Sequence, residues 1–234
     1  MSNTVFLAGA SGVIGRRLVP LLRRRGLDVV GTTRSPDRVR QIESLGARAI
    51  VVDAYDRDAL VAAVVGAAPT FVIHQLTDLS YGFAPDRIDE TRARNARLRT
   101  EATPNLVLAA QSAGARRLIA QSIAWVYQPG PEPHGEADPI EPGVHGVDAL
   151  ERAVLGAANI EGIVLRYGWF YGPGANAEPA GRPGVHVDAA ANAAVLALDR
   201  GSPGAYNIAE SGPYLSTARA RRELGWDPEF RAEP

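Results

Sequence analysis

The stretch that decides the fold lies near the start of the chain and reads Val5-Phe6-Leu7-Ala8-Gly9-Ala10-Ser11-Gly12-Val13-Ile14-Gly15-Arg16-Arg17-Leu18. Residues 5–8 have the length and residue types of a buried strand. Three glycines then follow with the spacing G-x-x-G-x-x-G, and an apolar-periodic helix begins within that spacing. Glycines let the backbone approach a pyrophosphate closely, and the helix start offers unpaired N–H groups and a positive dipole end. Because the strand pattern before the glycines and the helix pattern after them can both be recognised, a dinucleotide phosphate site is favoured over a turn without a ligand. The candidate residues are Gly9, Ser11, Gly12, Val13, Ile14 and Gly15.

Strand and helix patterns alternate through the first two-thirds of the chain. Strand patterns cover residues 5–8, 28–33, 49–52, 71–74, 117–121 and 162–166, and helical patterns cover 13–25, 36–45, 57–65, 87–113 and 147–157. Alternating units with continuously apolar strands predict an α/β fold, a Rossmann-type doubly wound parallel sheet covered on both faces. Pro104 falls inside the pattern at 87–113 and should kink or divide that helix.

Two segments without periodicity predict loops over the carboxyl ends of the strands. Residues 128–146 are rich in proline, glycine and acidic side chains, and residues 172–184 are similar. The tail predicts a helix at 186–200, a strand at 205–209 and a last helix at 217–225. We therefore divide the chain into a dinucleotide-binding domain, 1–168, and a reduced C-terminal substrate-lobe segment, 169–234, packed on the same domain.

Charge and composition exclude several classes of function. A formal net charge of −1 argues against nucleic acid or an anionic membrane surface as the main partner. The chain has no cysteine, no apolar run near the ~20 residues of a membrane span, and no signal-peptide pattern at its start. We expect a cytoplasmic protein with a small-molecule substrate. All 25 basic residues are arginines, so any mechanism that needs a lysine ammonium is excluded.

A second cofactor-binding stretch follows the second predicted strand and reads Gly31-Thr32-Thr33-Arg34-Ser35. An NAD-selective site usually has an acid here, which accepts from the ribose 2′-OH. That acid is absent, and Thr33, Arg34 and Ser35 offer a guanidinium and two hydroxyl groups that suit a 2′-phosphate. NADP is therefore favoured over NAD, with a solvated surface role for Arg34 as the alternative.

Residues after the third and fourth strands complete the predicted cofactor site. Asp53, with Ala54 beside it, ends the third strand and would accept from the adenine amino group. A helix-cap or turn role for Asp53 is the alternative. Gln75, Leu76 and Thr77 follow the fourth strand and would line the diphosphate and ribose.

Further motifs give the chain a family resemblance. It resembles the extended short-chain dehydrogenase/reductase superfamily, the NAD-dependent epimerases and dehydratases, in pieces that run in family order: residues 9–15, 72–74, 103–106, 126–127, 165–174, 186–188, 206–208 and 220–226. The resemblance implies a nicotinamide-dependent oxidoreductase or epimerase/dehydratase. Extended members also often dimerise through a four-helix bundle, and the apolar faces of the helices at 87–113 and 147–157 permit such a homodimer.

The chain departs from this family where the proton is handled. The family's relay resembles a Tyr-x-x-x-Lys pair with a nearby Ser or Thr, in which the ammonium lowers the pKa of the tyrosine. By register on Glu151, the tyrosine position falls on Gly143 and the lysine position on Val147. The active site is therefore degenerate with respect to the family.

Three side chains are candidates for the remaining chemistry. The family's serine position falls on Ile123 without a gap and on Ser122 with a one-residue shift, which makes the Ser122 hydroxyl a substrate-positioning candidate. Tyr127 is an unassisted phenol with an expected pKa near ~10, and packing is its alternative role. His145 precedes the helix that normally carries the relay and titrates near neutrality; a surface-loop histidine is its alternative. Arg99 stands where relatives commonly carry an active-site asparagine.

Three functions stay open at this point. The sequence favours an NADP-binding oxidoreductase-like protein of the epimerase/dehydratase type that acts on a small organic substrate. The second is a non-redox, isomerase- or cyclase-like enzyme that uses the fold as a scaffold, and the third is a non-enzymatic dinucleotide-sensing regulator. The spacing of histidine, aspartate and glutamate suggests no metal site.

Overall fold

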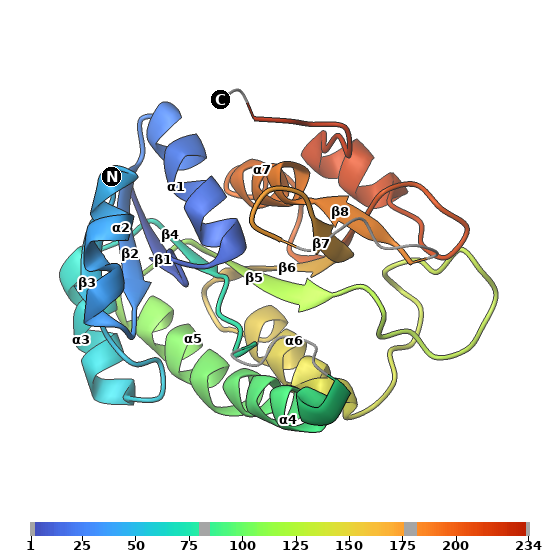
Figure 1. The fold of residues 1–234 in the computed structure, drawn as a ribbon, viewed down its shortest axis with the longest axis horizontal. Coiled ribbons are helices and arrows are strands. Elements are labelled where there is room, and N and C mark those ends of the chain that lie inside the picture. Colours follow the sequence, from blue (N-terminus) through green and yellow to red (C-terminus); the bar gives the residue numbers. More distant parts are fainter. Residues whose placement is uncertain (1–2, 80–84, 176–181, 233–234) are drawn as a thin grey trace.

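A seven-stranded parallel sheet forms the framework of the protein (Figure 1). The computed structural model describes residues 3–79, 85–175 and 182–232. The strand order is β3-β2-β1-β4-β5-β6-β9, and every neighbouring pair is parallel. The strands are β1 (Thr4–Ala8), β2 (Asp28–Thr33), β3 (Arg48–Val51), β4 (Phe71–His74), β5 (Arg117–Ile123), β6 (Glu161–Tyr167) and β9 (Gly204–Ile208). The predicted Rossmann-type, doubly wound α/β fold is confirmed.

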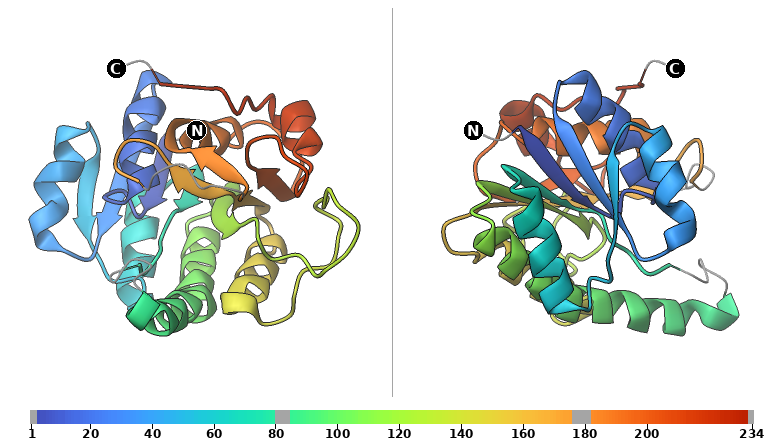
Figure 2. Two further views of the ribbon diagram at one scale, coloured as in Figure 1. Left: turned by 45° about the vertical axis from the view of Figure 1, so that its right-hand side comes forward. Right: turned by 90° about the vertical axis from the view of Figure 1, so that its left-hand side faces the viewer.

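Helices cover both faces of this sheet (Figures 1 and 2). One face carries α1 (Val13–Arg24), α2 (Val39–Ser44) and α7 (Val187–Leu196). The other carries α3 (Arg57–Ala67), α5 (Thr103–Ser112) and α6 (Val147–Leu155), with α4 (Ile88–Arg97) ahead of α5. None of the helices in the described part of the chain combines the length and the apolar character that crossing a membrane requires.

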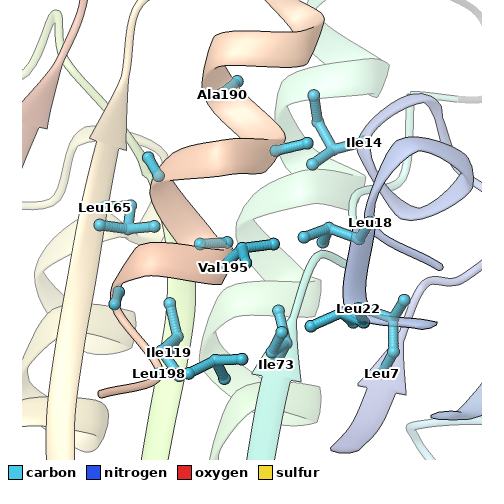
Figure 3. Close-up of a cluster of buried hydrophobic side chains, with 14 of the residues drawn as sticks. Leu7, Ile14, Leu18, Leu22, Ile73, Ile119, Leu165, Ala190, Val195 and Leu198 are labelled. Carbon is cyan, nitrogen blue, oxygen red and sulfur yellow. The ribbon is translucent and has the colours of Figure 1, made fainter. Parts of the chain in front are cut away.

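The strands are continuously apolar because each of them contributes to two cores. Successive side chains of a strand point to opposite faces of the sheet. Leu7 of β1 therefore packs beneath α1 and α7, while its neighbour Phe6 packs on the side of α3, α5 and α6. Figure 3 shows Leu18 of α1 and Val195 of α7 in the first of these cores.

The order of the strands determines where a ligand can enter. From β1 the chain winds outward through β2 to β3, and it then returns to the other side of β1 and continues through β4, β5 and β6. The direction of winding therefore reverses between β1 and β4. In doubly wound sheets the crevice at the carboxyl ends of such a strand pair is the usual ligand site.

The helical pattern at 87–113 is divided, as predicted, but by a π-helical turn rather than a simple kink. α4 ends at Arg97, the π-helical turn covers Leu98–Ala102, and α5 begins at Thr103. Pro104 is the second residue of α5. Because proline has no N–H to donate to the preceding turn, the regular hydrogen-bond ladder is interrupted just before it.

Other boundaries also differ from the predictions. β5 continues to Ile123 rather than ending at residue 121, which keeps Ser122 within the strand. The predicted last helix is largely a π-helical turn, Ala220–Leu224. A small parallel sheet of β7 (Trp169–Tyr171) and β8 (Gly184–His186) was not predicted, because two three-residue strands carry no periodicity. Residues 176–181 of the predicted loop lie outside the described residues, and the division at residue 168 stays a prediction.

Candidate active site

The loop between β1 and α1 lies at the reversal point and needs two of its three glycines for the fold itself. Gly9 adopts φ +93°, and a Cβ there would lie 2.8 Å from the carbonyl oxygen of Gln75. Gly15 lies so close to Gly9 that a Cβ would overlap the Gly9 carbonyl oxygen. Only glycine fits at these two positions.

Gly12 is different, because the fold does not require a glycine there. It is exposed, its φ is an ordinary −75°, and a Cβ would have the Gly9 carbonyl oxygen, at 3.3 Å, as its nearest contact. Gly12 caps α1 without a side-chain hydrogen bond, and the first turn of α1 has no acidic residue. The open helix start therefore suits an anion. Ser11 and Val13 beside it are half-buried, while Ile14 belongs to the core.

The predicted 2′-phosphate residues lie at the carboxyl end of β2. The backbone N–H of Ser35 donates to the Thr33 hydroxyl at 3.1 Å, so this hydroxyl stabilises the turn. Arg34 is 57% exposed and extends to the buried carboxylate of Asp78, with 3.5 Å between Nη1 and Oδ2. Arg34 thus lies between the end of β2 and the segment after β4, with more than half of its side chain exposed.

The carboxylate of Asp53 takes part in a local turn. Its Oδ1 accepts from the backbone N–H of Tyr55 at 3.0 Å. The helix-cap role that was open for Asp53 belongs instead to Asp56, whose side chain accepts from Ala59 at the start of α3. The carbonyl oxygen of Ala54 accepts from the Asn105 side chain at 3.1 Å, which joins this loop to α5.

The segment after β4 contains a buried polar side chain that has no hydrogen-bond partner among the described residues. Gln75 is 5% exposed, and within the described residues neither its amide nitrogen nor its oxygen is at hydrogen-bond geometry. The nearby Tyr167 hydroxyl donates to the carbonyl oxygen of Ala190 at 3.1 Å. Buried polar groups without hydrogen-bond partners are rare. A polar group of a bound dinucleotide would provide the Gln75 amide with such a partner. Leu76 is half-buried, and Thr77 is exposed at the edge of the adjoining cavity.

That cavity has a volume of about 1230 Å³ and opens at the carboxyl ends of the strands. Its walls include Val13 of α1, Ser122 of β5 and several aromatic rings. Two of these rings, Trp125 and Trp169, are stacked with centroids 4.3 Å apart and planes inclined by 11°. The cavity therefore joins the predicted dinucleotide site to an aromatic-walled space of ligand size.

A buried polar network supports the wall of this cavity. Ser122 Oγ donates to Glu151 Oε1 at 2.8 Å, and Arg166 binds both oxygens of the same carboxylate, at 3.0 and 2.7 Å. Arg166 Nη1 also donates to the hydroxyl of Tyr127 at 2.9 Å, and that hydroxyl donates to Asn207 Oδ1 at 2.6 Å. These side chains come from β5, α6, β6, β9 and the loop after β5, so they are brought together only by the sheet.

The network restricts two of the three catalytic candidates, Ser122 and Tyr127. The Ser122 hydroxyl donates its hydrogen bond to Glu151, so towards the cavity its oxygen can accept a hydrogen bond but has no second hydrogen to donate. Tyr127 is buried behind the wall, and burial raises the pKa of its hydroxyl. This placement favours the packing role of Tyr127. His145 belongs to the 3-10 turn Val144–Gly146, but its side chain lies outside the described residues.

The positions of the family relay carry no titratable side chain in this fold. Gly143 is exposed with φ +73°, and Val147 is buried at the start of α6. Within the described residues, no three His, Asp or Glu side chains are grouped as metal ligands would be. His74 is fully buried and bonded to Thr103 Oγ1 at 2.9 Å, and its pKa is lowered to about 4, chiefly by burial and further by Arg99. It therefore stays neutral at physiological pH.

Sequence reasoning missed the pair of Glu151 and Arg166, although one signal was available. Arg166 is a charged residue in an otherwise apolar strand, and such a residue needs a buried partner. Which acid would provide it could not be known before the fold. Arg99, which the sequence singled out, lies in the π-helical turn, is 5% exposed and forms part of the cavity wall.

Comparison with known proteins finds proteins that are similar to this chain in sequence or in fold. A family model described as NAD(P)H-binding matches residues 9–191. A Streptomyces sp protein named 3-diazoavenalumate denitrifying reductase is 40% identical over 89% of this chain and 76% of its own length. UDP-glucose 4-epimerase from Thermotoga maritima has a TM-score of 0.79 at 17% identity, covering 97% of this chain and 94% of that chain. The Bordetella bronchiseptica enzyme WbmG, solved in complex with NAD, has a TM-score of 0.78 at 18% identity, covering 98% and 90%.

Proposed function

Because the chain belongs to the NAD(P)H-binding family, we propose that it is an NADP-dependent reductase that replaces a diazonium group on an aromatic substrate by hydrogen. The observation that carries the proposal is the hydrogen bond from Ser122 to Glu151. It supports a site in which, among the side chains that the structure describes, the Ser122 hydroxyl is not available to donate a proton to a substrate that receives a hydride.

The cofactor part of the proposal rests on residues at the carboxyl ends of β1, β2 and β4. The open helix start at Gly12 would hold the pyrophosphate, and the buried amide of Gln75 would bond to a polar group of the dinucleotide. Arg34 would bind a 2′-phosphate, since a guanidinium forms strong charge-assisted hydrogen bonds to phosphate. Arg34 is therefore the residue that favours NADP over NAD.

The proton requirement discriminates between classes of reductase substrate. Reduction of a carbonyl group needs a hydride on carbon and a proton on oxygen, and the family provides that proton from its relay. Among the side chains that the structure describes, the relay positions are Gly143 and Val147, and the Ser122 hydroxyl donates its hydrogen bond to Glu151. A reaction that needs only a hydride fits this site better.

Replacement of a diazonium group is such a reaction. A bound reduced dinucleotide supplies a hydride, and an arenediazonium ion plus a hydride gives the arene and dinitrogen, with no proton taken up. The new C–H bond receives the electron pair of the hydride, and the electron pair of the broken C–N bond leaves with dinitrogen. The relative named as a denitrifying reductase of a diazo compound supports this choice. Stacked Trp125 and Trp169 suit a flat aromatic ring.

The test uses 3-diazobenzoate with NADPH deuterated at either face of nicotinamide C4. We expect protein-dependent formation of deuterated benzoate from one of the two isotopomers, with NADP⁺ formed in equal amount. Mass spectrometry of the benzoate measures the transfer, and samples without protein give the spontaneous reaction. The matched substrate is 3-acetylbenzoate, a ketone of similar shape that we expect to stay unreduced.

Two results would overturn the proposal. If neither isotopomer gives deuterated benzoate above the protein-free background, the protein is not this reductase. If the ketone is reduced as fast as the diazonium compound, a proton donor is present and the hydride-only argument is wrong.

A further inference from the structure

Two arginines from distant parts of the chain converge on one buried carboxylate. Asp78 lies in the segment after β4 and is 5% exposed, and its Oδ2 is 3.5 Å from Arg34 Nη1 and 3.5 Å from Arg94 Nε. Arg34 directly follows β2, whereas Arg94 belongs to α4. The fold therefore brings a side chain of α4 to the residue for which the sequence predicts a contact with the 2′-phosphate of NADP.

A second contact holds α4 at this place. The backbone N–H of Asp78 donates to Asn95 Oδ1 at 3.1 Å, so two neighbouring residues of α4 bind the carboxylate and the backbone of Asp78. Asn95 also lines the large cavity, together with Thr77 of the segment predicted to contact the dinucleotide. The position of Arg94 relative to the predicted cofactor site therefore depends on the packing of α4 and not on one long side chain alone.

The spacing of the two guanidinium groups suits a single phosphate. Because both nitrogens lie 3.5 Å from the same carboxylate oxygen, they are separated by at most twice that distance. A phosphate can bridge such a separation, since each charge-assisted hydrogen bond spans about 2.8 Å and can lead to a different phosphate oxygen. Arginine also presents its N–H donors in a planar fork that matches phosphate geometry. The two side chains can therefore bind one phosphate group together.

Charge and exposure favour an anion on the solvent side of this group. The side chains of Arg34 and Arg94 are 57% and 40% exposed, so an anion that arrives from solvent meets them before it meets the buried carboxylate. With Asp78 they carry two positive charges and one negative charge, a net charge of +1. Glu90 lies 3.7 Å from Arg94, but it pairs more closely with Arg87, at 2.6 Å, and these two charges cancel. A phosphate with a charge of about −1.5 to −2 would neutralise the positive charge that remains.

We propose that Arg94 is a specificity-determining residue that binds the 2′-phosphate of NADP together with Arg34. This inference rests on the proposed function for the choice of NADP. Asp78 acts as a positioning residue, because it holds both guanidinium groups near the end of β2 before the dinucleotide arrives, and less side-chain freedom is then lost on binding. NAD has a hydroxyl group in place of this phosphate, so neither arginine gains a charged partner from it.

Another arginine of the same helix provides a matched control. The side chain of Arg92 is 53% exposed and pairs with Asp89 at 3.4 Å. Its exposure is similar to that of Arg94, but its acidic partner is an exposed residue of its own helix rather than the buried Asp78. Removal of the charge at Arg92 changes the overall charge of this surface by the same amount. Any difference between the two variants therefore reports the position of the charge.

The experiment is isothermal titration with adenosine 2′,5′-bisphosphate and with adenosine 5′-monophosphate. The two probes differ only in the 2′-phosphate, so the ratio of their Kd values measures the recognition of that group. We expect wild-type protein to bind the bisphosphate at least about tenfold more tightly. Arg94→Gln should reduce this preference about fivefold or more and leave the Kd for the monophosphate unchanged, whereas Arg92→Gln should change the preference by less than about twofold. Arg94→Lys keeps the charge without the planar fork and should keep part of the preference.

The inference and the proposed function can fail separately. An unchanged preference in Arg94→Gln, with circular dichroism showing the variant folded, would overturn the inference and leave NADP selection to Arg34. An equal loss in Arg94→Gln and Arg92→Gln would overturn it too, because surface charge alone would then explain the effect. Equal binding of the two probes by wild-type protein would contradict the choice of NADP itself, and this comparison needs no variant to fold. A preference for the bisphosphate without diazonium turnover would contradict only the reductase.

Discussion

The open helix start at Gly12 allows one substitution to change stability and cofactor binding in opposite directions. Gly12→Asp would place a carboxylate at the N-cap of α1, and Gly12→Asn would place a neutral side chain of the same shape there. Both side chains are good N-caps. A Cβ at this position has the Gly9 carbonyl oxygen at 3.3 Å as its nearest contact, and this small crowding is common to both variants. The pair therefore isolates the effect of one negative charge.

The structure determines the sign and the approximate size of each effect. The first turn of α1 has no acidic residue, so an aspartate gains the full interaction with the helix dipole, about 0.3–1 kcal/mol. In a chain of this size that raises Tm by about 1–4 °C relative to the asparagine variant. A phosphate charge at about 4 Å from the new carboxylate is repelled by about 1–4 kcal/mol. The Kd for NADPH should therefore be at least about fivefold higher in the aspartate variant.

The assay combines thermal denaturation with calorimetric titration of NADPH at low and at high salt. We expect the aspartate variant to melt higher and to bind NADPH more weakly than the asparagine variant, with both differences reduced at high salt because salt screens exposed charges. Equal NADPH affinities of the two variants would refute the reasoning, since the pyrophosphate would then not lie at the start of α1.

Three further predictions concern individual side chains. Arg34→Ala should raise the Kd for NADPH about tenfold or more and leave the Kd for NADH unchanged, as measured by calorimetry; equal effects on both would contradict a 2′-phosphate contact. Tyr127→Phe removes the hydroxyl that bonds to Arg166 and Asn207. The free energy of unfolding, measured by denaturation in urea, should therefore fall by about 1–3 kcal/mol. Diazonium turnover should persist, and its loss in a folded variant would mean that Tyr127 is catalytic. Because burial lowers the pKa of His74 to about 4, protonation favours the unfolded chain. The free energy of unfolding should therefore fall by up to about 3 kcal/mol from pH 6.5 towards pH 4; His74→Gln should flatten this slope, and an equally steep slope in that variant would contradict the assignment.

The sequence by itself was sufficient for the fold, and it also carries the prediction of where the cofactor binds. The strand at residues 5–8, the glycine spacing and the helix after it form one continuous stretch, so local pattern carries the information. The parallel sheet followed from the alternation of apolar strands and helices, because such strands must be covered on both faces. The division of the helix at 87–113 followed from a single proline.

Only the tertiary structure decided how the substrate end of the site is built. The side chains of the buried polar network lie on separate elements; they are Ser122, Tyr127, Glu151, Arg166 and Asn207. No local pattern specifies that Arg166 pairs with Glu151 or that Ser122 donates a hydrogen bond to the same carboxylate. These contacts depend on strand register and on the seating of α6 against the sheet. A charged residue in an apolar strand indicates that a buried partner must exist. The sequence does not identify this partner, because pairing between distant residues leaves no periodic signal along the chain.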